Sequence, residues 1–251
     1  MTLSERERER YKRQILLFGE AGQEKLKQAH IFIAGAGGLG CPVAIYLAVA
    51  GIGTITIVDR DVVDQSNLNR QILHADRDIG RKKTASAVEK LRILNPDITV
   101  HAIDATIDGS NARKLVGGAD GIVDAMDNFP TRYLLNELAH EKKIPFFHGA
   151  VRGMYGQAMT VLPGDSPCLA CVFPHAPPPE VFPVVGVTPG FIGTVQATEV
   201  IKFLTGTGEL LAGRLFMWDG LTGRAEEIAV GKDPGCKVCC GTNQKHAKKE
   251  K

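Results

Sequence analysis

A glycine-rich turn between an apolar strand and an apolar helix constrains the fold of this chain more than any other feature. The strand is expected at residues 30–34 and the helix at 40–50. The turn contains Gly35, Gly37, Gly38 and Gly40. Glycines at such a turn let the backbone approach a phosphate group. A second apolar run, residues 54–58, ends at Asp59, where a carboxylate can accept hydrogen bonds from a ribose. The pattern predicts a strand–helix–strand unit that binds a nucleotide.

Apolar runs and helical patterns alternate along the first 150 residues. The expected strands are residues 30–34, 54–58, 98–103, 121–125 and one that begins at 145–147. The expected helices are residues 40–50, 78–94, 111–116 and 129–142, with a further helical segment at 3–28. Such alternation predicts a mostly parallel, Rossmann-like sheet with helices on both faces.

The pattern changes after about residue 150. Strands are expected at 157–162, 214–219 and 225–230, with a helix at 191–204 and a proline-rich connection at 174–189. We therefore predict an α/β fold whose parallel sheet continues into a zinc-clipped C-terminal half with antiparallel strands. The expected parts are an N-terminal helical segment (1–29), a nucleotide-binding part (30–165), a C-terminal part with a substrate crossover loop (166–241) and a flexible basic tail (242–251). Residues 1–241 are expected to form one structural domain.

The charge distribution limits the classes of partner. The net charge is +2, and the last eight residues hold four lysines and one glutamate, which leaves the rest of the chain near neutral. A near-neutral chain argues against a nucleic-acid partner.

Residues 41–58 are uncharged, but glycines at 51 and 53 interrupt them, so we expect a buried helix and strand rather than a membrane span. The mixed-charge start is not a secretory signal, and a cytoplasmic location is expected.

The residues that follow the glycine turn argue for phosphoanhydride chemistry. The turn and Asp59 alone would fit an NAD-dependent oxidoreductase. An enzyme that breaks the α–β phosphoanhydride of ATP must also neutralise the triphosphate and hold Mg²⁺ with a carboxylate. Asn67, Arg70 and Lys83 can supply the donors, and Asp127 the metal ligand.

Each of these residues also has a purely structural interpretation. Asn67 and Arg70 could tie down a loop, and Lys83, next to Lys82, could be a solvated residue at the start of a helix. Asp127 or its neighbour Asn128 could cap the helix that begins near residue 129. Because all of these residues occur together and in this order, the functional interpretation is favoured.

Two pairs of cysteines predict a metal site. Cys168 and Cys171 form one CxxC motif, and Cys236 and Cys239 form the other. Four thiolates can complete the coordination of one structural Zn²⁺, which would clip the end of the chain onto its second half. Free buried thiols or a disulfide are the alternatives, and Cys240 is a less well spaced ligand than Cys239.

The ordered set of motifs resembles the ThiF/MoeB/HesA family, the bacterial relatives of ubiquitin-activating enzymes, from about residue 4 to 241. The motifs are Arg10-Tyr11-Lys-Arg13-Gln14, the glycine turn, Asp59, Ser66-Asn-Leu-Asn-Arg70-Gln, Lys83 and Asp124-x-x-Asp127-Asn128. The resemblance implies a nucleotide site at these motifs, including Ser66 and Asn128, with Asp127 on Mg²⁺. It also implies a homodimer in which Arg13 reaches the partner's site, and the same four-cysteine zinc.

The activity implied by the resemblance is adenylation of a carboxylate. In the family, the terminal glycine carboxylate of a ubiquitin-like sulfur carrier ending in Gly-Gly attacks the α-phosphate of ATP and releases pyrophosphate. Arg70, Lys83, Asp127 and Arg13 would then be catalytic. A carboxylate is already ionised at neutral pH, so we expect Arg70 and Lys83 to act electrostatically rather than as proton shuttles. The acceptor could instead be a peptide or a modified tRNA, and the chain could be a non-catalytic scaffold.

The sequence departs from the family in one loop. Many members carry a cysteine a few residues before a Gly-Val pair, and here Phe182 takes that place before Gly186. We expect no covalent enzyme intermediate and an external sulfur donor as a further partner. The proline-rich loop is either a lid over the substrate tail or a plain spacer. Trp218 and Tyr155 are expected in the core, and His148 is expected to be packed or solvated rather than to line a channel.

Overall fold

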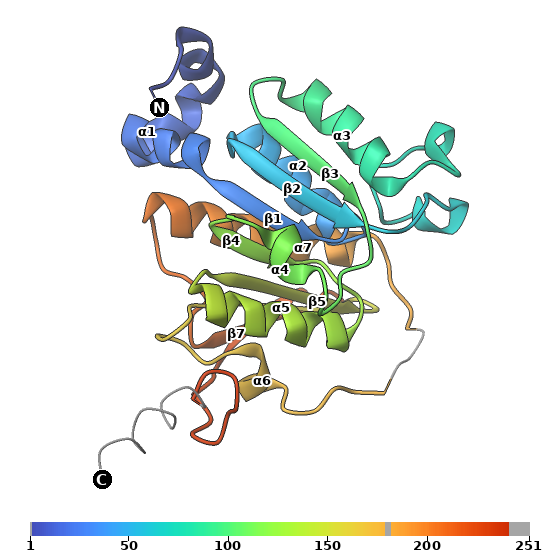
Figure 1. Ribbon diagram of the computed structural model, residues 1–251, viewed down its shortest axis with the longest axis vertical. Helices are drawn as coiled ribbons and strands as arrows, with labels where there is room; N and C mark the ends of the chain where they lie inside the picture. Colours follow the sequence, from blue (N-terminus) through green and yellow to red (C-terminus); the bar gives the residue numbers. More distant parts are fainter. Residues whose placement is uncertain (1, 179–181, 241–251) are drawn as a thin grey trace.

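An eight-stranded mixed sheet forms the centre of the computed structural model, which describes residues 2–178 and 182–240 (Figure 1). The strand order is β3-β2-β1-β4-β5-β6-β7-β8. The strands are β1 (His30–Ala34), β2 (Thr54–Asp59), β3 (Thr99–Asp104), β4 (Gly121–Asp124), β5 (Phe146–Arg152), β6 (Tyr155–Val161), β7 (Arg214–Asp219) and β8 (Arg224–Ala229). Neighbours from β3 to β5 are parallel, and those from β5 to β8 are antiparallel. The predicted fold class is confirmed.

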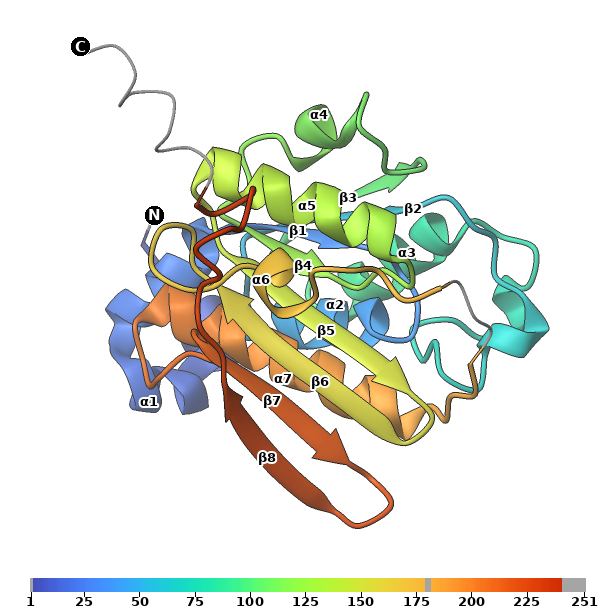
Figure 2. The ribbon, with the colours of Figure 1, turned by 90° about the horizontal axis from the view of Figure 1, so that it is seen from below.

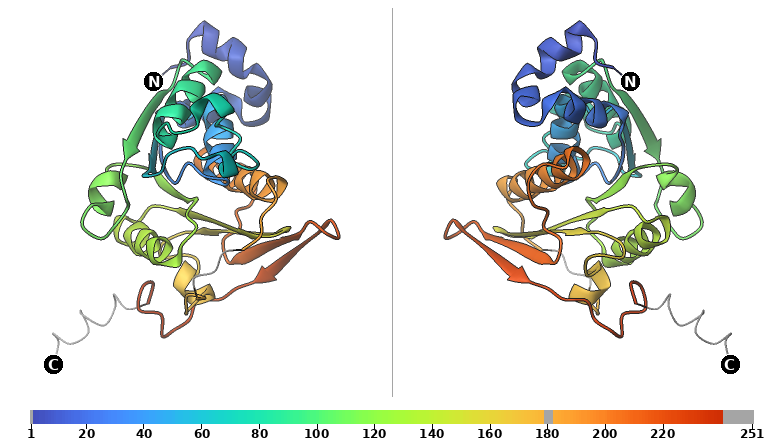
Figure 3. Two further views of the ribbon diagram at one scale, coloured as in Figure 1. Left: turned by 90° about the vertical axis from the view of Figure 1, so that its right-hand side faces the viewer. Right: turned by 90° about the vertical axis from the view of Figure 1, so that its left-hand side faces the viewer.

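Helices cover both faces of the sheet (Figures 2 and 3). They are α1 (Glu5–Gln28), α2 (Gly40–Ala50), α3 (Lys83–Leu94), α4 (Ala112–Val116), α5 (Phe129–Lys142), α6 (Leu169–Val172) and α7 (Val187–Thr205), with 3₁₀ turns at Gln65–Asn67 and Asp76–Asp78. Helices α1, α2, α3 and α7 share one apolar core, and α4, α5 and α6 share another. Strands β1 and β4 are buried on both sides because a parallel sheet is covered on both faces.

Local chemistry explains the ends of several elements. Helix α1 begins with a capping box in which Ser4 and Glu7 bond each other's backbone N–H groups, and it is kinked at Gly19, whose φ is 72°. Helix α3 ends at Leu94, as expected from Asn95 and the proline that follows it.

Three boundaries differ from the sequence expectation. Helix α3 begins at Lys83 rather than at residue 78, because Asp76–Asp78 forms a separate 3₁₀ turn and Gly80 has a φ of 81°. Helix α7 begins at Val187, four residues before the expected start. Strands β5 and β6 extend to a tight turn at Gly153, where φ is 61°. That turn brings Tyr155 to the surface with 51% of its area exposed, so its assignment to the core was wrong.

The sheet runs without interruption from the nucleotide-binding part into the C-terminal part. The boundaries between these parts stay a prediction, and the expected tail at 242–251 lies outside the described residues. Residues 41–58 form part of α2 and β2. Within residues 2–178 and 182–240, no helix is both long enough and apolar enough to cross a membrane.

Candidate active site

A cavity of about 620 Å³ opens at the carboxyl ends of β1, β2 and β4. The chain passes from β1 to β2 on one side and continues to β4 on the other, and ligands of open α/β sheets bind where the strand order reverses in this way. The cavity is lined by Gly35, Gly37, Gly38, Leu39, Val58, Asp59, Arg60, Asp61, Arg70, Gln71, Lys83, Ala105, Thr106, Ile107, Ala125, Met126, Asp127, Asn128, Thr131, Arg132, Val151, Phe182, Val184 and Pro189.

The glycine turn is compact because glycines, which lack a side chain, stand where its backbone segments approach each other closely. Gly35 has a φ of 105°, and its N–H donates to the Val58 carbonyl at 2.8 Å. A Cβ at Gly40 would lie 2.0 Å from the carbonyl oxygen of Gly35. Gly40 therefore allows the helix to pack on the turn, whereas Gly37 and Gly38 line the cavity itself.

Asp59 is fixed at the end of β2 by backbone donors. Its Oδ2 accepts from the Ala36 N–H at 2.8 Å, and its Oδ1 accepts from the Asp61 N–H at 2.8 Å. Asp59 thus joins the glycine turn to the end of β2 and lines the cavity, and its contact with a ribose stays a prediction.

Lys83 is the first residue of α3 and is 5% exposed. Its Nζ donates to Oδ2 of Asp61 at 2.9 Å. The alternative of a solvated lysine is wrong for Lys83, whereas the neighbouring Lys82 has a side chain that is 46% exposed. Sequence reasoning did not assign Asp61 a role, although its position two residues after a predicted strand end indicated the same edge of the sheet.

Arg70 lines the cavity and also ties down its own loop. Its Nη1 donates to the Ser66 carbonyl at 2.8 Å and to Oδ1 of Asn69 at 3.0 Å. Oδ1 of Asn67 accepts from the Asp64 N–H at 3.3 Å within the 3₁₀ turn. Ser66 and Asn67 are not among the described residues that line the cavity, and their contact with a nucleotide stays a prediction.

Asp127 and Asn128 lie between β4 and α5. Asn128 is the N-cap of α5, with its side chain accepting from the Thr131 N–H at 3.0 Å, which confirms the capping interpretation for this residue. Asp127 is exposed at the cavity, and the Asn128 amide donates to its Oδ1 at 3.3 Å. A carboxylate oxygen beside a phosphate site is the ligand type that Mg²⁺ prefers.

The positions of Arg13, Arg132 and the segment after β3 complete the description of the site. Arg13 is exposed on α1 and is not among the described residues lining this chain's own cavity. Arg132, to which no role was assigned from the sequence, is 6% exposed and lines the cavity. The part of the cavity wall that follows β3, which includes Thr106 and Ile107, was missed as well. The sequence feature that could have indicated these residues was their position just after a predicted parallel strand.

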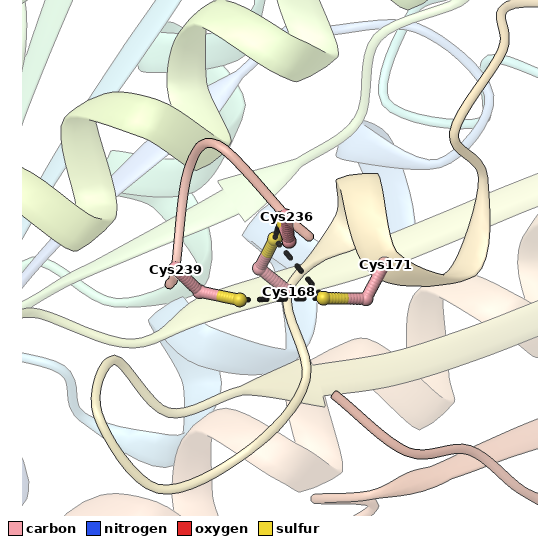
Figure 4. Close-up of side chains that lie close together, drawn as sticks. All are labelled: Cys168, Cys171, Cys236 and Cys239. Carbon is pink, nitrogen blue, oxygen red and sulfur yellow. Dashed lines mark hydrogen bonds between the residues drawn. The ribbon is translucent and has the colours of Figure 1, made fainter. Parts of the chain in front are cut away.

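The four predicted cysteines converge near α6 (Figure 4). Their sulfur atoms all lie within 4.8 Å of one another. The Sγ–Sγ distances are 3.9 Å for Cys168–Cys171, 3.6 Å for Cys168–Cys236 and 3.3 Å for Cys171–Cys239. All six cysteines are free thiols, so the disulfide alternative is wrong. The group includes Cys239 rather than Cys240, as the spacing predicted.

This cluster fits a zinc ion in both spacing and surroundings. Four thiolates at the usual Zn–S distance place neighbouring sulfurs about 3.8 Å apart in a tetrahedron. Burial raises the pKa of the Cys168 thiol to about 11, and the neighbouring Asn136 amide opposes that rise. The backbone N–H of Asp233 donates to the sulfur of Cys171 at 3.4 Å. Donors of this kind stabilise the thiolate form that a metal requires.

The loop before α7 presents no thiol to the cavity. Phe182 lines the cavity at the place where many family members carry a cysteine. Cys41 is fully buried at the start of α2, and burial raises the pKa of its thiol to about 12. No cysteine is among the described lining residues.

The comparison with known proteins agrees with this geometry. A family model described as the ThiF family matches residues 11–238. The chain belongs to the ThiF family. It is 44% identical over 247 residues to the SAMP-activating enzyme E1 of Haloferax volcanii, with 95% of this chain and 91% of that protein covered. It is 40% identical to the sulfur carrier protein adenylyltransferase of Thermus thermophilus, with 95% and 93% covered. This ThiF-family chain is an adenylyltransferase and uses ATP.

Other ThiF-family relatives are longer. The chain is 41% identical to the adenylyltransferase and sulfurtransferase MOCS3 of Drosophila yakuba and spans 53% of its length, with 92% of this chain covered. Among solved structures, MccB of E. coli in complex with MccA-N7isoASN superposes with a TM-score of 0.83 at 25% identity, covering 93% of this chain and 74% of MccB.

Proposed function

We propose that this adenylyltransferase activates the C-terminal glycine carboxylate of a ubiquitin-like sulfur carrier ending in Gly-Gly and releases pyrophosphate from ATP. The observation that supports this best is the convergence of five sequence motifs on one cavity. The glycine turn, Asp59, Arg70, Lys83 and Asp127 come from separate stretches of the chain. The relatives named for sulfur-carrier and SAMP activation match nearly the whole chain and suggest the acceptor.

The reaction requires charge neutralisation rather than proton transfer. The attacking carboxylate and the triphosphate are both anionic at neutral pH, so cations near the α-phosphate lower the barrier. Arg70 lines the cavity, and Lys83 lies there with little exposure to water, which strengthens its interaction with an anion. Asp61 holds the Lys83 ammonium at 2.9 Å and competes with the phosphates for it.

Two separate groups of side chains suit metal ions in different roles. Asp127 would hold Mg²⁺, which neutralises phosphate charge when bound. The four cysteines would hold Zn²⁺, and because they fill all four positions of a tetrahedron this ion would be structural.

A homodimer would complete the site through Arg13. Arg13, Leu16 and Leu17 are spaced at i, i+3 and i+4 on α1 and therefore share one face. Leu16 and Leu17 are 81% and 73% exposed, which is unusual for adjacent leucines and typical of an interface. Arg13 at this face would reach the cavity of the second subunit.

The activated carrier would leave as an acyl-adenylate, to be attacked by an external sulfur donor. Phe182 at the cavity and the high pKa of Cys41 both argue against a nucleophilic thiol of this enzyme. The proline-rich loop falls partly outside the described residues, and its action as a lid stays a prediction. A carrier–enzyme adduct that a reductant cleaves would contradict this part of the proposal.

Pyrophosphate exchange tests the proposal directly. We expect exchange with carriers ending in Gly-Gly and none with the same carriers lacking the last glycine. Lys83→Ala should lower exchange by about 100-fold or more, because it removes a preorganised cation from the reacting phosphate. Lys82→Ala is the matched control, since Lys82 is an exposed lysine paired with Asp104 and should leave exchange near wild type.

Two outcomes would count against the assignment. Exchange at wild-type level in Lys83→Ala would remove the role of Lys83. Exchange with an unrelated peptide carboxylate, but with no carrier, would point to a peptide acceptor instead. A modified tRNA acceptor is disfavoured because the chain outside its lysine-rich end is near neutral.

A further inference from the structure

The loop that carries Asp127 is held by an arginine whose own role in the reaction is unassigned. The loop comprises residues 125–128, between β4 and α5. At its start, the Ala125 N–H donates to the Ala34 carbonyl at 3.1 Å. At Met126, the N–H donates to Oδ1 of Asp124 at 3.1 Å, and the carbonyl accepts from Nε and Nη2 of Arg132 at 3.2 and 2.5 Å. Arg132 thus contacts the backbone one residue before the carboxylate.

Arg132 is a buried cation with its donors directed to backbone carbonyls. It is 6% exposed, and its Nη2 also donates to the Gly149 carbonyl at 3.2 Å. Its guanidinium carbon lies 5.4 Å from the centroid of the Phe129 ring. These contacts join the loop to β5 and to the first turn of α5, and they require the planar, forked geometry of arginine.

A buried carboxylate balances this charge. Oδ2 of Asp124 lies 3.6 Å from Nε of Arg132, and Asp124 is fully buried at the end of β4. The same oxygen accepts from Nδ1 of His148 at 2.7 Å, and His148 is also fully buried. Since a carboxylate only accepts hydrogen bonds, Nδ1 of His148 carries a proton.

His148 donates to the Asp124 carboxylate and orients it. The Gln157 amide lies 3.4 Å from its Nε2 and can donate to it. Burial lowers the pKa of His148, which is consistent with a neutral ring. The trio of Asp124, His148 and Arg132 thus contains one negative and one positive charge, and all three residues are buried next to the nucleotide cavity.

We infer that Arg132, oriented by Asp124 and His148, is a positioning residue that fixes the loop so that the Asp127 carboxylate stays at the cavity to receive Mg²⁺. This inference rests on the proposed role of Asp127. Arg132 acts on the loop through the Met126 carbonyl, because the hydrogen bonds that it makes within the described chain go to backbone oxygens.

The test measures binding of a non-hydrolysable ATP analogue with and without Mg²⁺, for the wild type, Arg132→Lys, Asp124→Asn and Asp127→Asn. Lysine keeps the charge of Arg132 but cannot bond two carbonyls with a planar fork. We expect Arg132→Lys and Asp124→Asn to lose roughly tenfold in the Mg²⁺-dependent affinity, as for residues that orient a metal ligand. Affinity without Mg²⁺ should change by less than about twofold. Hydrogen exchange of the 125–128 backbone should become faster in both variants.

Thr160→Val is the matched control, because it removes a buried hydrogen bond of 2.6 Å to Glu199 away from this loop. Equal losses with and without Mg²⁺, or unchanged hydrogen exchange at 125–128 in Arg132→Lys, would overturn the inference. If Asp127→Asn leaves the Mg²⁺ dependence intact, the proposed role of Asp127 is wrong. The hydrogen-exchange result then decides separately whether Arg132 orders the loop.

Discussion

Asp78 is a fully buried carboxylate beside α3, held by charged and backbone donors. It pairs with Lys90 and with Nη1 of Arg81 at 2.7 Å, and it accepts from the Ala75 N–H at 2.9 Å. Burial opposes its ionisation, but the hydrogen bonds from Lys90 and Ala75 outweigh that effect and lower the pKa of Asp78 to about 2. A lowered pKa in the folded state means that the ionised carboxylate stabilises the fold.

Asp78→Asn should therefore destabilise the protein in a pH-dependent way. The expected loss in the free energy of unfolding is about 2–3 kcal/mol at neutral pH, from the pKa shift and the unpaired Lys90. The stabilisation is present above the unfolded pKa of about 4 and is lost as the pH falls toward 2. Denaturant unfolding of the wild type and of Asp78→Asn at several pH values measures the difference in their free energies of unfolding. A difference that stays constant from neutral to strongly acidic pH would contradict the lowered pKa of Asp78.

The two adjacent lysines show what the sequence could and could not predict at the scale of single residues. Lys82 and Lys83 are chemically identical, and the local sequence left open whether Lys83 was a solvated residue like its neighbour. The structure buries Lys83 and leaves Lys82 half exposed, because α3 begins at Lys83 and turns it toward Asp61. Which of the two lysines is buried depends on where α3 begins, and that start was predicted five residues too early.

At the scale of elements, the strands and helices of the parallel half were largely predictable. Apolar runs such as β1 and β2 end at turn residues, and the carboxyl ends of parallel strands meet at one edge. This allowed Asp59 and Asp127 to be assigned to one site, and both residues line the same cavity. The contacts of Arg132 and His148 were not predictable, since they depend on side chains from β4, β5 and α5 meeting inside the protein.

The four-cysteine cluster connects α6 with the segment that follows β8, and this link between two elements can be tested with two neighbouring cysteines. Cys239→Ser should reduce bound zinc well below one ion per chain, because Cys239 belongs to the four-sulfur group. Its melting temperature should fall by about 10 °C, the shift expected for a loss of several kcal/mol. Cys240→Ser should keep both zinc and stability. The sulfur of Cys240 lies 3.7 Å from that of Cys239. Zinc loss only in Cys240→Ser would reverse the ligand assignment.

At the scale of the whole molecule, the nucleotide site draws its described residues from one sheet edge, but the family resemblance assigns one catalytic residue to the other end of the fold. Arg13 lies on α1, which packs in the core shared with α2, α3 and α7. The N-terminal segment was predicted as helical, yet its exposed leucines gave no sequence signal of their own. Only the structure distinguishes Leu16 and Leu17, which are exposed, from Leu26, which is buried.

Mixing two inactive variants tests whether Arg13 works across a dimer. Arg13→Ala and Lys83→Ala should each abolish pyrophosphate exchange alone. In a mixed dimer, the subunit with Lys83 intact receives Arg13 from the other subunit, so one of its two sites is complete. When equal amounts of the two variants pair at random into two-fold dimers, about half of the dimers are mixed. The mixture should therefore restore about one quarter of wild-type exchange. If Arg13 acts within its own chain, no mixed dimer has a complete site and the mixture stays inactive. Full exchange in Arg13→Ala alone would remove this residue from the site altogether.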